Sequence, residues 1–184
     1  MTEVRLHRVL LLPGWLNSGP THWQSHWEAL HGHRRVEQDD WLWPRRGDWM
    51  ARLDEVLLES DEPAELVAHS LGCPLVAAWA AHSAHTARVR AALLVATPDT
   101  ERTDMPPNLF NWRPIVRRCL PFPSTVVWSD DDPYCAPAES LRMAEGWGSE
   151  AVAIGSRGHV NGDSGLADWP VGLALLESLI SRAN

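Results

Sequence analysis

The chain has 184 residues, of which 45% are hydrophobic and 22% are charged, a composition typical of one globular domain. Its formal net charge is −8 and its arginines are scattered, which argues against the clustered basic surface that binds nucleic acids or anionic membranes. No apolar run approaches the length of a transmembrane helix. We therefore expect a single domain over residues 1–184 that binds neither nucleic acid nor membrane.

The amino-terminal segment and the cysteines bear on where the protein works. The first apolar stretch is short and contains Arg8, unlike the apolar region of a secretory signal peptide. The cysteines Cys73, Cys119 and Cys135 are odd in number and lack the spacing of metal ligands. Reduced thiols of this kind are typical of a cytoplasmic protein, which is what we expect.

Short apolar runs alternate with amphipathic stretches along the chain, without an internal repeat or a linker. Pro and Gly punctuate the runs, and apolar residues recur at helical spacing in the stretches between them. In chain order, the predicted elements are a strand at 4–12, a helix at 21–30, a weak strand at 34–40, a helix at 48–59, a strand at 64–69, a helix at 71–84, strands at 90–98 and 124–133, a helix at 138–148, a strand at 150–159 and a helix at 166–183.

Two of the predicted helices have clear apolar faces. The first places Trp23, Trp27 and Leu30 on one stripe. The second has a face formed by Trp49, Leu53, Val56 and Leu57. The chain has 11 Trp against one Tyr and two Phe. Because Trp is a large packing unit with one donor to satisfy, we expect most of them to fill the core or line a cleft.

The alternation of strands and helices predicts an α/β fold, with a mostly parallel sheet of about six strands and helices on both of its faces. In such sheets, ligands bind at the carboxyl ends of the strands. The distinctive residues of this chain follow predicted strand ends, at Pro13-Gly14-Trp15, Ser70, Asp130 to Asp132 and His159. We therefore expect a functional site where these strand ends meet.

Ser70 lies in the segment Ala68-His69-Ser70-Leu71-Gly72, which has the pattern of a nucleophile elbow with Ala in place of the first Gly. The strand and helix backbones pass closely in that turn, so the residues two before and two after the serine must be small. The serine itself adopts a strained conformation. A serine at a helix start is also a common N-cap, so the elbow alone does not identify a nucleophile.

A serine hydroxyl needs an adjacent base, and hydrolases with this elbow carry serine, acid and histidine in that chain order. His159 follows the last predicted strand, and Gly155 and Gly158 allow its loop to bend toward Ser70. Strand position, chain order and loop composition thus agree on His159 as the base.

The segment WSDDDPYC supplies three aspartates directly after a predicted strand. Asp132 is the preferred partner for the histidine because Pro133 fixes a turn after it. Asp130 and Asp131 remain alternatives, and a solvated acidic loop accounts for at least one of these two.

An acyl-transfer enzyme also needs donors that stabilise an oxyanion. The backbone N–H of Leu71, directly after the serine, is the first candidate, and the dipole of the following helix adds to it. The second is the N–H of Trp15, with that of Leu16 as the alternative. Trp15, Leu16 and Trp112 are expected to line an apolar substrate pocket.

Two competing interpretations concern metal binding and a thiol nucleophile. His22 and His26 have the i, i+4 spacing of zinc ligands, but the metalloprotease Glu and an obvious third ligand are missing. Cys73 lies three residues past Ser70, where a small buried residue is expected rather than a second nucleophile. We therefore expect no metal site.

The stretches LLPGWLNSGPTHWQSHWE, VAHSLGC, SDDDPYC and GHVNGDSGLADWP together resemble the small serine hydrolases of α/β-hydrolase fold, the family of retinoblastoma-binding protein 9 and YdeN-like bacterial predicted esterases. The resemblance runs through nearly the whole chain. It implies a triad of Ser70, Asp132 and His159 on a compact α/β-hydrolase fold without a large cap domain and without the two antiparallel strands that begin larger members. The segment 99–123 is a candidate for a short flap over the site.

The expected function is that of a serine hydrolase, a carboxylesterase that acts on small acyl esters through an acyl-enzyme and requires no metal or organic cofactor. Two alternatives stay open. One is an amidase or aminopeptidase with the same triad, and the other is a non-catalytic protein-binding module on the hydrolase fold. The expected partner is a small-molecule ester, and the sequence itself does not indicate a protein partner.

Overall fold

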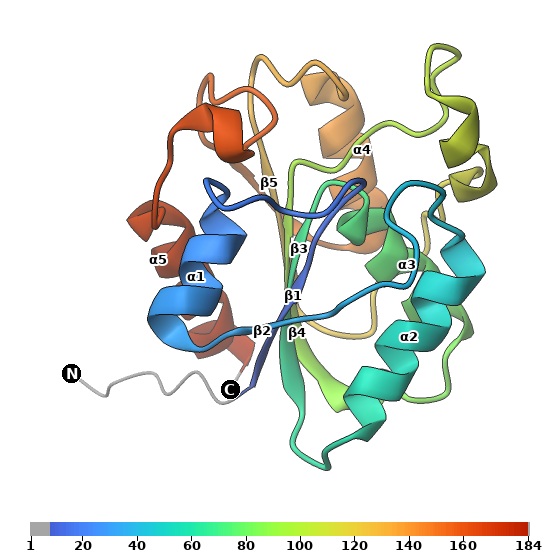
Figure 1. Ribbon diagram of the computed structural model, residues 1–184, viewed down its shortest axis with the longest axis vertical. Helices are drawn as coiled ribbons and strands as arrows, with labels where there is room; N and C mark the ends of the chain where they lie inside the picture. Colours follow the sequence, from blue (N-terminus) through green and yellow to red (C-terminus); the bar gives the residue numbers. More distant parts are fainter. Residues whose placement is uncertain (1–7, 184) are drawn as a thin grey trace.

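The computed structural model describes residues 8–183, so the part of the first predicted strand at 4–7 lies outside the described residues. Six strands form one parallel sheet in the order β2-β1-β3-β4-β5-β6, which confirms the predicted sheet (Figure 1). The strands are β1 (Val9–Leu12), β2 (Arg34–Arg35), β3 (Ala64–His69), β4 (Val89–Val95), β5 (Ser124–Trp128) and β6 (Glu150–Ala153).

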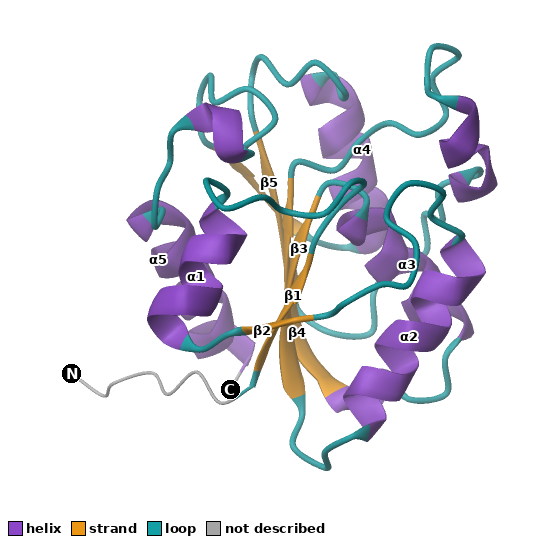
Figure 2. Cartoon of the chain, in the orientation of Figure 1, coloured by secondary structure: helices purple, strands orange, loops and turns teal. Residues whose placement is uncertain are grey.

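Helices connect the strands and cover both faces of the sheet (Figure 2). The α-helices are α1 (Trp23–His31), α2 (Arg46–Leu58), α3 (Gly72–His82), α4 (Pro137–Trp147) and α5 (Pro170–Ala183). Short 3-10 helices form η1 (Thr86–Arg88), η2 (Pro107–Trp112) and η3 (Gly162–Ser164) within the connecting loops. All five predicted α-helices are therefore confirmed, while the 3-10 helices were not predicted.

Two hydrophobic cores lie on opposite faces of the sheet. Figure 1 shows α1 and α5 on one face and α2, α3 and α4 on the other. Successive side chains of a strand point to opposite faces, so Val9 and Leu11 pack with α1 and α5, while Leu10 and Leu12 pack with α2 and α3. A strand that is buried on both faces in this way reads as a continuous apolar run.

The strand order places a switch point between β1 and β3. From β1 the chain first adds β2 on one side and then returns to build β3 on the other side. In open parallel sheets, a crevice forms outside the carboxyl ends of the strands at such a point. Gly14 follows β1 and Ser70 follows β3, so the sheet brings these two loops to the same crevice.

The apolar faces predicted for the helices hold in part. The face of α2 is buried as predicted, at Trp49, Leu53, Val56 and Leu57. In α1, Trp23 and Trp27 are buried but Leu30 is 60% exposed, so its place on the buried stripe was wrong. Helical periodicity defines the face of a residue, but not whether another element covers that part of the face.

Tryptophans fill both cores, as expected. The fully buried ones are Trp23, Trp27, Trp49, Trp79, Trp112 and Trp147. Five of their indole N–H groups donate to backbone carbonyls in loops, for example that of Trp27 to Asp168 at 2.7 Å and that of Trp147 to Val116 at 2.7 Å. The sixth, that of Trp79, donates to the carboxylate of Asp54 in α2. A buried indole must satisfy its single donor, so these side chains join the core to the loops around it.

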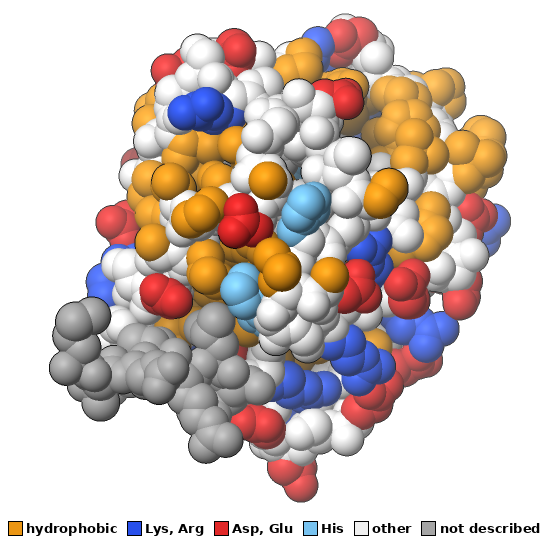
Figure 3. Space-filling model, turned by 60° about the vertical axis from the view of Figure 1, so that its left-hand side comes forward, with side chains coloured by type: hydrophobic (Ala, Val, Ile, Leu, Met, Phe, Trp, Pro, Cys, Tyr) orange, Lys and Arg blue, Asp and Glu red, His pale blue; other side chains and the backbone are white. Residues whose placement is uncertain are grey.

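The surface and the helix lengths agree with the composition. Within residues 8–183, no helix combines the length and apolar character that crossing a membrane requires. Figure 3 shows Arg side chains interspersed with Asp and Glu on the face that it draws. That face therefore presents no extended basic patch among the described residues.

Two glycines allow β1 to pass directly against the turn after β3. A Cβ on Gly72 would lie 2.4 Å from the carbonyl oxygen of Leu12, and a Cβ on Gly14 would lie 2.7 Å from the Cβ of Ser70. These distances are shorter than any ordinary non-bonded contact. The close approach explains why the second position after the serine must be glycine in this chain.

We predict that Gly72→Ala lowers the free energy of unfolding by about 1–3 kcal/mol, because the added methyl group must push β1 and α3 apart. Gly47→Ala is the matched control, since Gly47 lies in the first turn of α2 and a methyl group added there would have no atom within 4 Å. That control should leave stability unchanged or raise it by up to about 1 kcal/mol. Urea denaturation followed by Trp fluorescence measures both, and equal stability of Gly72→Ala and wild type would contradict the prediction.

Candidate active site

Ser70 occupies a strained backbone conformation at the end of β3. Its φ is 53°, in the left-handed region that side chains rarely adopt. Its N–H donates to the carbonyl of Val95 at 2.9 Å, and its own carbonyl accepts from the N–H of Cys73 at 2.9 Å. These two hydrogen bonds tie the turn between β3 and α3 to the end of β4 and to the first turn of α3. The turn leaves the hydroxyl at the carboxyl edge of the sheet, as in a nucleophile elbow.

His159 lies in the loop after β6, and its ring faces Ser70. The Nε2 atom is 2.8 Å from Ser70 Oγ, and the Nδ1 atom is 2.9 Å and 3.0 Å from the two carboxylate oxygens of Asp132. A carboxylate can only accept, so Nδ1 carries the proton and Nε2 is left to accept from the serine hydroxyl. The structure thus brings Ser70, His159 and Asp132 into one hydrogen-bonded chain.

The three aspartates after β5 differ in what they contact. Asp132 reaches the histidine, and its side chain is 4% exposed. Asp131 accepts from the N–H of Gly158 at 2.8 Å and from Ser129 Oγ at 2.9 Å, and the Gly158 hydrogen bond leads the causes that hold its pKa below its usual value. The side chain of Asp130 is exposed and has no hydrogen bond within residues 8–183. Asp131 therefore braces the loop that carries His159, a role that the sequence did not reveal.

The backbone after His159 is also strained. Val160 has a φ of 52°, which is unusual for a β-branched residue and costs on the order of 1–3 kcal/mol. The buried Nε1–H of Trp23 donates to the Val160 carbonyl at 2.8 Å, and Val160 is itself fully buried. The first turn of α1 therefore holds this loop against the sheet.

Two backbone N–H groups are free to face a substrate oxygen. Within the described residues, the N–H groups of Trp15 and Leu71 donate to no other protein atom. The N–H of Leu16 instead donates to the carbonyl of Trp41 at 3.2 Å, which removes it as an oxyanion donor. A Cβ added to Gly14 would lie 3.2 Å from the Leu71 nitrogen, so the loop after β1 runs beside this N–H.

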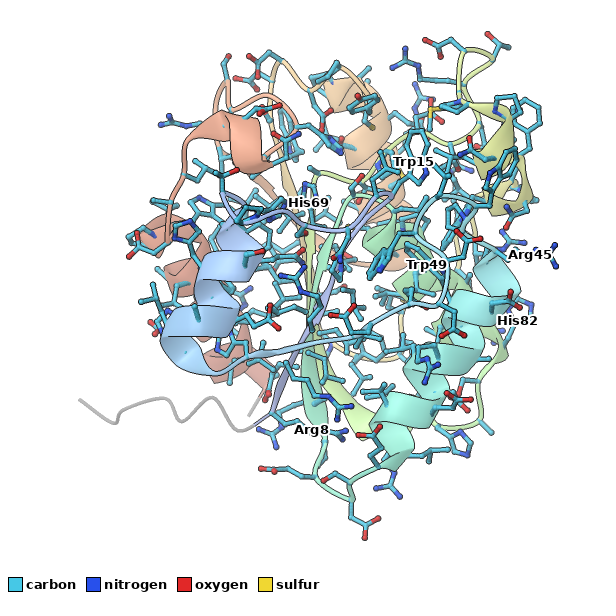
Figure 4. The ribbon with its side chains drawn as sticks, in the orientation of Figure 1. Arg8, Trp15, Arg45, Trp49, His69 and His82 are labelled. Carbon is cyan, nitrogen blue, oxygen red and sulfur yellow. The ribbon has the colours of Figure 1, made fainter. Side chains whose placement is uncertain are left out.

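A cavity of about 560 Å³ opens over Ser70 and His159. The loop after β1 contributes Trp15 and Leu16 to its wall, as expected from the sequence. The segment 99–123 contributes an apolar group on another side, formed by Met105, Pro106 and Leu109. Figure 4 shows Trp15 and His69 at the same end of the sheet. This cavity is large enough for a small organic substrate.

Trp112 does not line this cavity, which corrects the expected pocket role. Its side chain is fully buried, and its Nε1–H donates to the carbonyl of Pro44 at 2.9 Å. Its ring packs edge-on against Trp49, with ring centroids 5.3 Å apart. The 3-10 helix η2 directs the large apolar ring into the core beside α2.

Several residues at the cavity were not anticipated. His22, His69, Asn17, Asn161 and Tyr134 all line it. The ring of Tyr134 stands edge-on to that of His159, with centroids 4.6 Å apart. All of these residues lie in the four sequence stretches that resemble the serine hydrolases. No periodicity or spacing rule indicates which loop side chains turn toward a cavity.

The competing metal and thiol interpretations find no support in the geometry. Within residues 8–183, no group of three or more His, Cys, Asp or Glu could hold a metal ion. Both ring nitrogens of His22 are engaged in protein hydrogen bonds. Burial raises the pKa of the Cys73 thiol to about 12, and its Sγ points to the backbone carbonyls of Ala68 and Val95. A thiol in this environment is unreactive.

Solved structures share this fold over more than nine tenths of their length. A YdeN-like hydrolase from Pectobacterium atrosepticum is 25% identical, with a TM-score of 0.84 over 96% of this chain and 91% of its own. The ydeN gene product of Bacillus subtilis is 22% identical, with a TM-score of 0.71 over 95% and 98%. Esterase RhEst1 from Rhodococcus is 16% identical, with a TM-score of 0.70 over 99% and 93%. The compact α/β-hydrolase fold is thus shown.

The comparison with protein families identifies the family of this chain, whereas no curated protein matches it. The profile of a family described as serine hydrolase matches residues 9–178, which span every strand and most of α5. The chain therefore belongs to the serine hydrolase family, the family that its motifs resemble.

Proposed function

We propose that the protein is a carboxylesterase that hydrolyses small acyl esters, with Ser70 as the nucleophile. The observation that carries this proposal is the continuous hydrogen-bonded chain from Ser70 Oγ through both nitrogens of His159 to Asp132. Membership of the serine hydrolase family supports hydrolysis as the class of reaction. The strained backbone of Ser70, which presents the hydroxyl at the cavity, supports its role as the attacking group.

The first half-reaction forms an acyl-enzyme. Ser70 Oγ attacks the ester carbonyl carbon while His159 Nε2 takes the hydroxyl proton. Asp132 keeps the other proton on Nδ1 and stabilises the imidazolium that forms. When the tetrahedral intermediate collapses, His159 returns the proton to the leaving alcohol. The acyl group then remains bonded to Ser70.

The second half-reaction releases the acid. A water molecule takes the place of the alcohol, and His159 removes its proton as it attacks the acyl carbon. Collapse of the second tetrahedral intermediate breaks the bond to Ser70, and His159 Nε2 returns the proton to Oγ. The N–H groups of Leu71 and Trp15 stabilise the oxyanion in both halves, since they are the free donors beside the serine.

The cavity supports a small and largely apolar acyl group as the substrate. Its volume of about 560 Å³ lies within the range of small-molecule sites, and much of its wall is apolar, including Trp15, Met105 and Leu109. The Rhodococcus structure of the same fold is described as an esterase, which agrees with this choice of bond. Faster hydrolysis of aminoacyl p-nitroanilides than of p-nitrophenyl esters would favour an amidase instead.

We predict that Ser70→Ala abolishes hydrolysis of p-nitrophenyl acetate. Loss of a triad serine costs on the order of a millionfold in kcat in comparable chemistry. The assay should follow nitrophenolate release, together with labelling of the wild type by a fluorophosphonate probe. Thermal unfolding provides the control, because Ser70→Ala must keep a cooperative transition. Hydrolysis by the folded mutant at the wild-type rate would refute the nucleophile.

Asp132→Asn and Asp131→Asn form a matched pair that separates the two acidic roles. We predict that Asp132→Asn lowers kcat by about 10⁴-fold, because an amide beside Nδ1 favours the wrong tautomer of His159. Asn at position 131 still accepts from Gly158 and Ser129, so Asp131→Asn should lose much less activity. Steady-state kinetics on both variants checks the difference, and equal losses would contradict the assignment of Asp132.

A further inference from the structure

Two buried histidines outside the proposed triad join α1 to the loop of His159. His69 Nε2 lies 2.9 Å from the carbonyl oxygen of His159, and His69 Nδ1 lies 3.3 Å from His22 Nε2. His22 is the N-cap of α1, where its Nδ1 accepts from the N–H of Gln24 at 3.1 Å. His22 and His69, here called the histidine pair, are 4% and 5% exposed.

The hydrogen bonds run in series from Gln24 through His22 and His69 to His159, and the groups at the two ends of this series fix the positions of the ring protons. The His159 carbonyl can only accept, so His69 Nε2 must carry a proton. The N–H of Gln24 can only donate, so His22 Nδ1 must be unprotonated. A neutral His22 therefore carries its proton on Nε2 and donates it to an unprotonated Nδ1 of His69. Every hydrogen bond then runs in one direction, from Gln24 to the His159 carbonyl.

Burial keeps both rings neutral, as this arrangement requires. It lowers the pKa of His22 to about 3, and it lowers the pKa of His69 well below the ordinary value. The positive charge of Arg35 and the neighbouring histidine rings add to the lowering of the His22 pKa. A charged ring would carry protons on both nitrogens and would break one link of the chain.

This series of hydrogen bonds ends at the backbone of His159, the proposed general base. The His159 carbonyl accepts from His69, and the next carbonyl, that of Val160, accepts from the indole of Trp23. His22 and Trp23 are consecutive residues at the start of α1. Figure 4 shows His69 at the upper ends of the strands. The last residue of β3 and the first residue of α1 therefore hold two successive peptide groups, and Val160 keeps its left-handed φ of 52° between them.

We propose that the histidine pair are positioning residues, which set the orientation of the His159 ring toward Ser70 by fixing the backbone of its loop. This inference rests on the proposed function, since it assigns the pair to the same site. All four ring nitrogens of the pair are engaged in hydrogen bonds, so none is left to bind a substrate although both rings line the cavity. Disturbing the pair should therefore change kcat and leave KM in place.

The first experiment measures the tautomers and does not depend on catalysis. Long-range ¹H–¹⁵N NMR spectra of the full chain labelled with ¹⁵N-histidine distinguish a ring protonated at Nε2 from one protonated at Nδ1. We expect both His22 and His69 to be neutral Nε2–H tautomers at pH 7. An Nδ1–H tautomer or a charged ring at either position would overturn the inference.

The second experiment separates the two contacts of His22. In His22→Asn, the side-chain oxygen replaces Nδ1 as the cap acceptor, but the donor to His69 is lost. In His22→Gln, the amide reaches the position of Nε2 and keeps that donor, but the cap acceptor is lost. We expect His22→Asn to lower kcat by about 10- to 100-fold with KM unchanged, and His22→Gln to lose less.

Trp27→Phe is the control for a general weakening of α1. Trp27 is fully buried in the same helix and donates to the carbonyl of Asp168 rather than to either histidine. Its ring packs on Trp23 with centroids 4.9 Å apart, and the aromatic ring of Phe keeps a contact there. This variant should lower the melting temperature without lowering kcat at 25 °C. A loss of kcat that follows melting temperature across the three variants would show a merely structural role for His22 and would overturn the inference.

The rate of Ser70 labelling by a fluorophosphonate probe supplies an independent measure of the nucleophile. It should fall in His22→Asn in proportion to kcat, because it depends on the same contact with His159. An active wild type with an equally active His22→Asn refutes the positioning role alone. A folded wild type that shows the expected tautomers but neither hydrolyses esters nor takes the label refutes the proposed function instead.

Discussion

The hydrogen bond between Ser70 and His159 is the contact on which the rest of the site depends, and it joins residues 89 positions apart. It exists because every strand of the sheet is parallel, so the loops after β1, β3, β5 and β6 all leave from one edge. The two hydrophobic cores fix the sheet from both faces and leave little freedom at that edge. The precision of a 2.8 Å contact is thus a property of the whole fold rather than of the loops alone.

Backbone strain at this edge is balanced by specific neighbours. Ser70 and Val160 both have positive φ values, and the backbone of each is hydrogen-bonded to another element. The glycines at positions 14 and 72 add a second requirement, because side chains there would collide with the serine or with β1. Such conformations persist only where the surroundings over-determine them. The cores and the buried indoles that reach the loops therefore offset the strain at the site.

Much of this site could be predicted because the order of residues along the chain and their positions after apolar runs are visible in the sequence itself. Ser70, Asp132 and His159 each follow an apolar run, in the order that hydrolases use. Other features depend on three-dimensional packing that no spacing rule encodes. The sequence suggested zinc spacing for His22, whereas its ring meets His69 from another element. It predicted Trp112 at the cavity and Leu30 in the core, but Trp112 is buried and Leu30 is exposed, because burial depends on which elements pack over each residue. The hydrogen bond from Gly158 to Asp131 depends on the conformation of the loop, which the sequence pattern does not encode.

The buried neutral histidines also make the folded state less stable in acid. Burial holds the pKa of His22 at about 3 and that of His33 at about 4, whereas an unfolded histidine has a pKa of about 6.5. Unfolding therefore takes up protons in the interval between these values, so the folded state loses stability as pH falls below about 6.5, before most carboxylates titrate. The uncharged rings of these buried histidines thus make mild acidification a solvent condition that favours the unfolded chain.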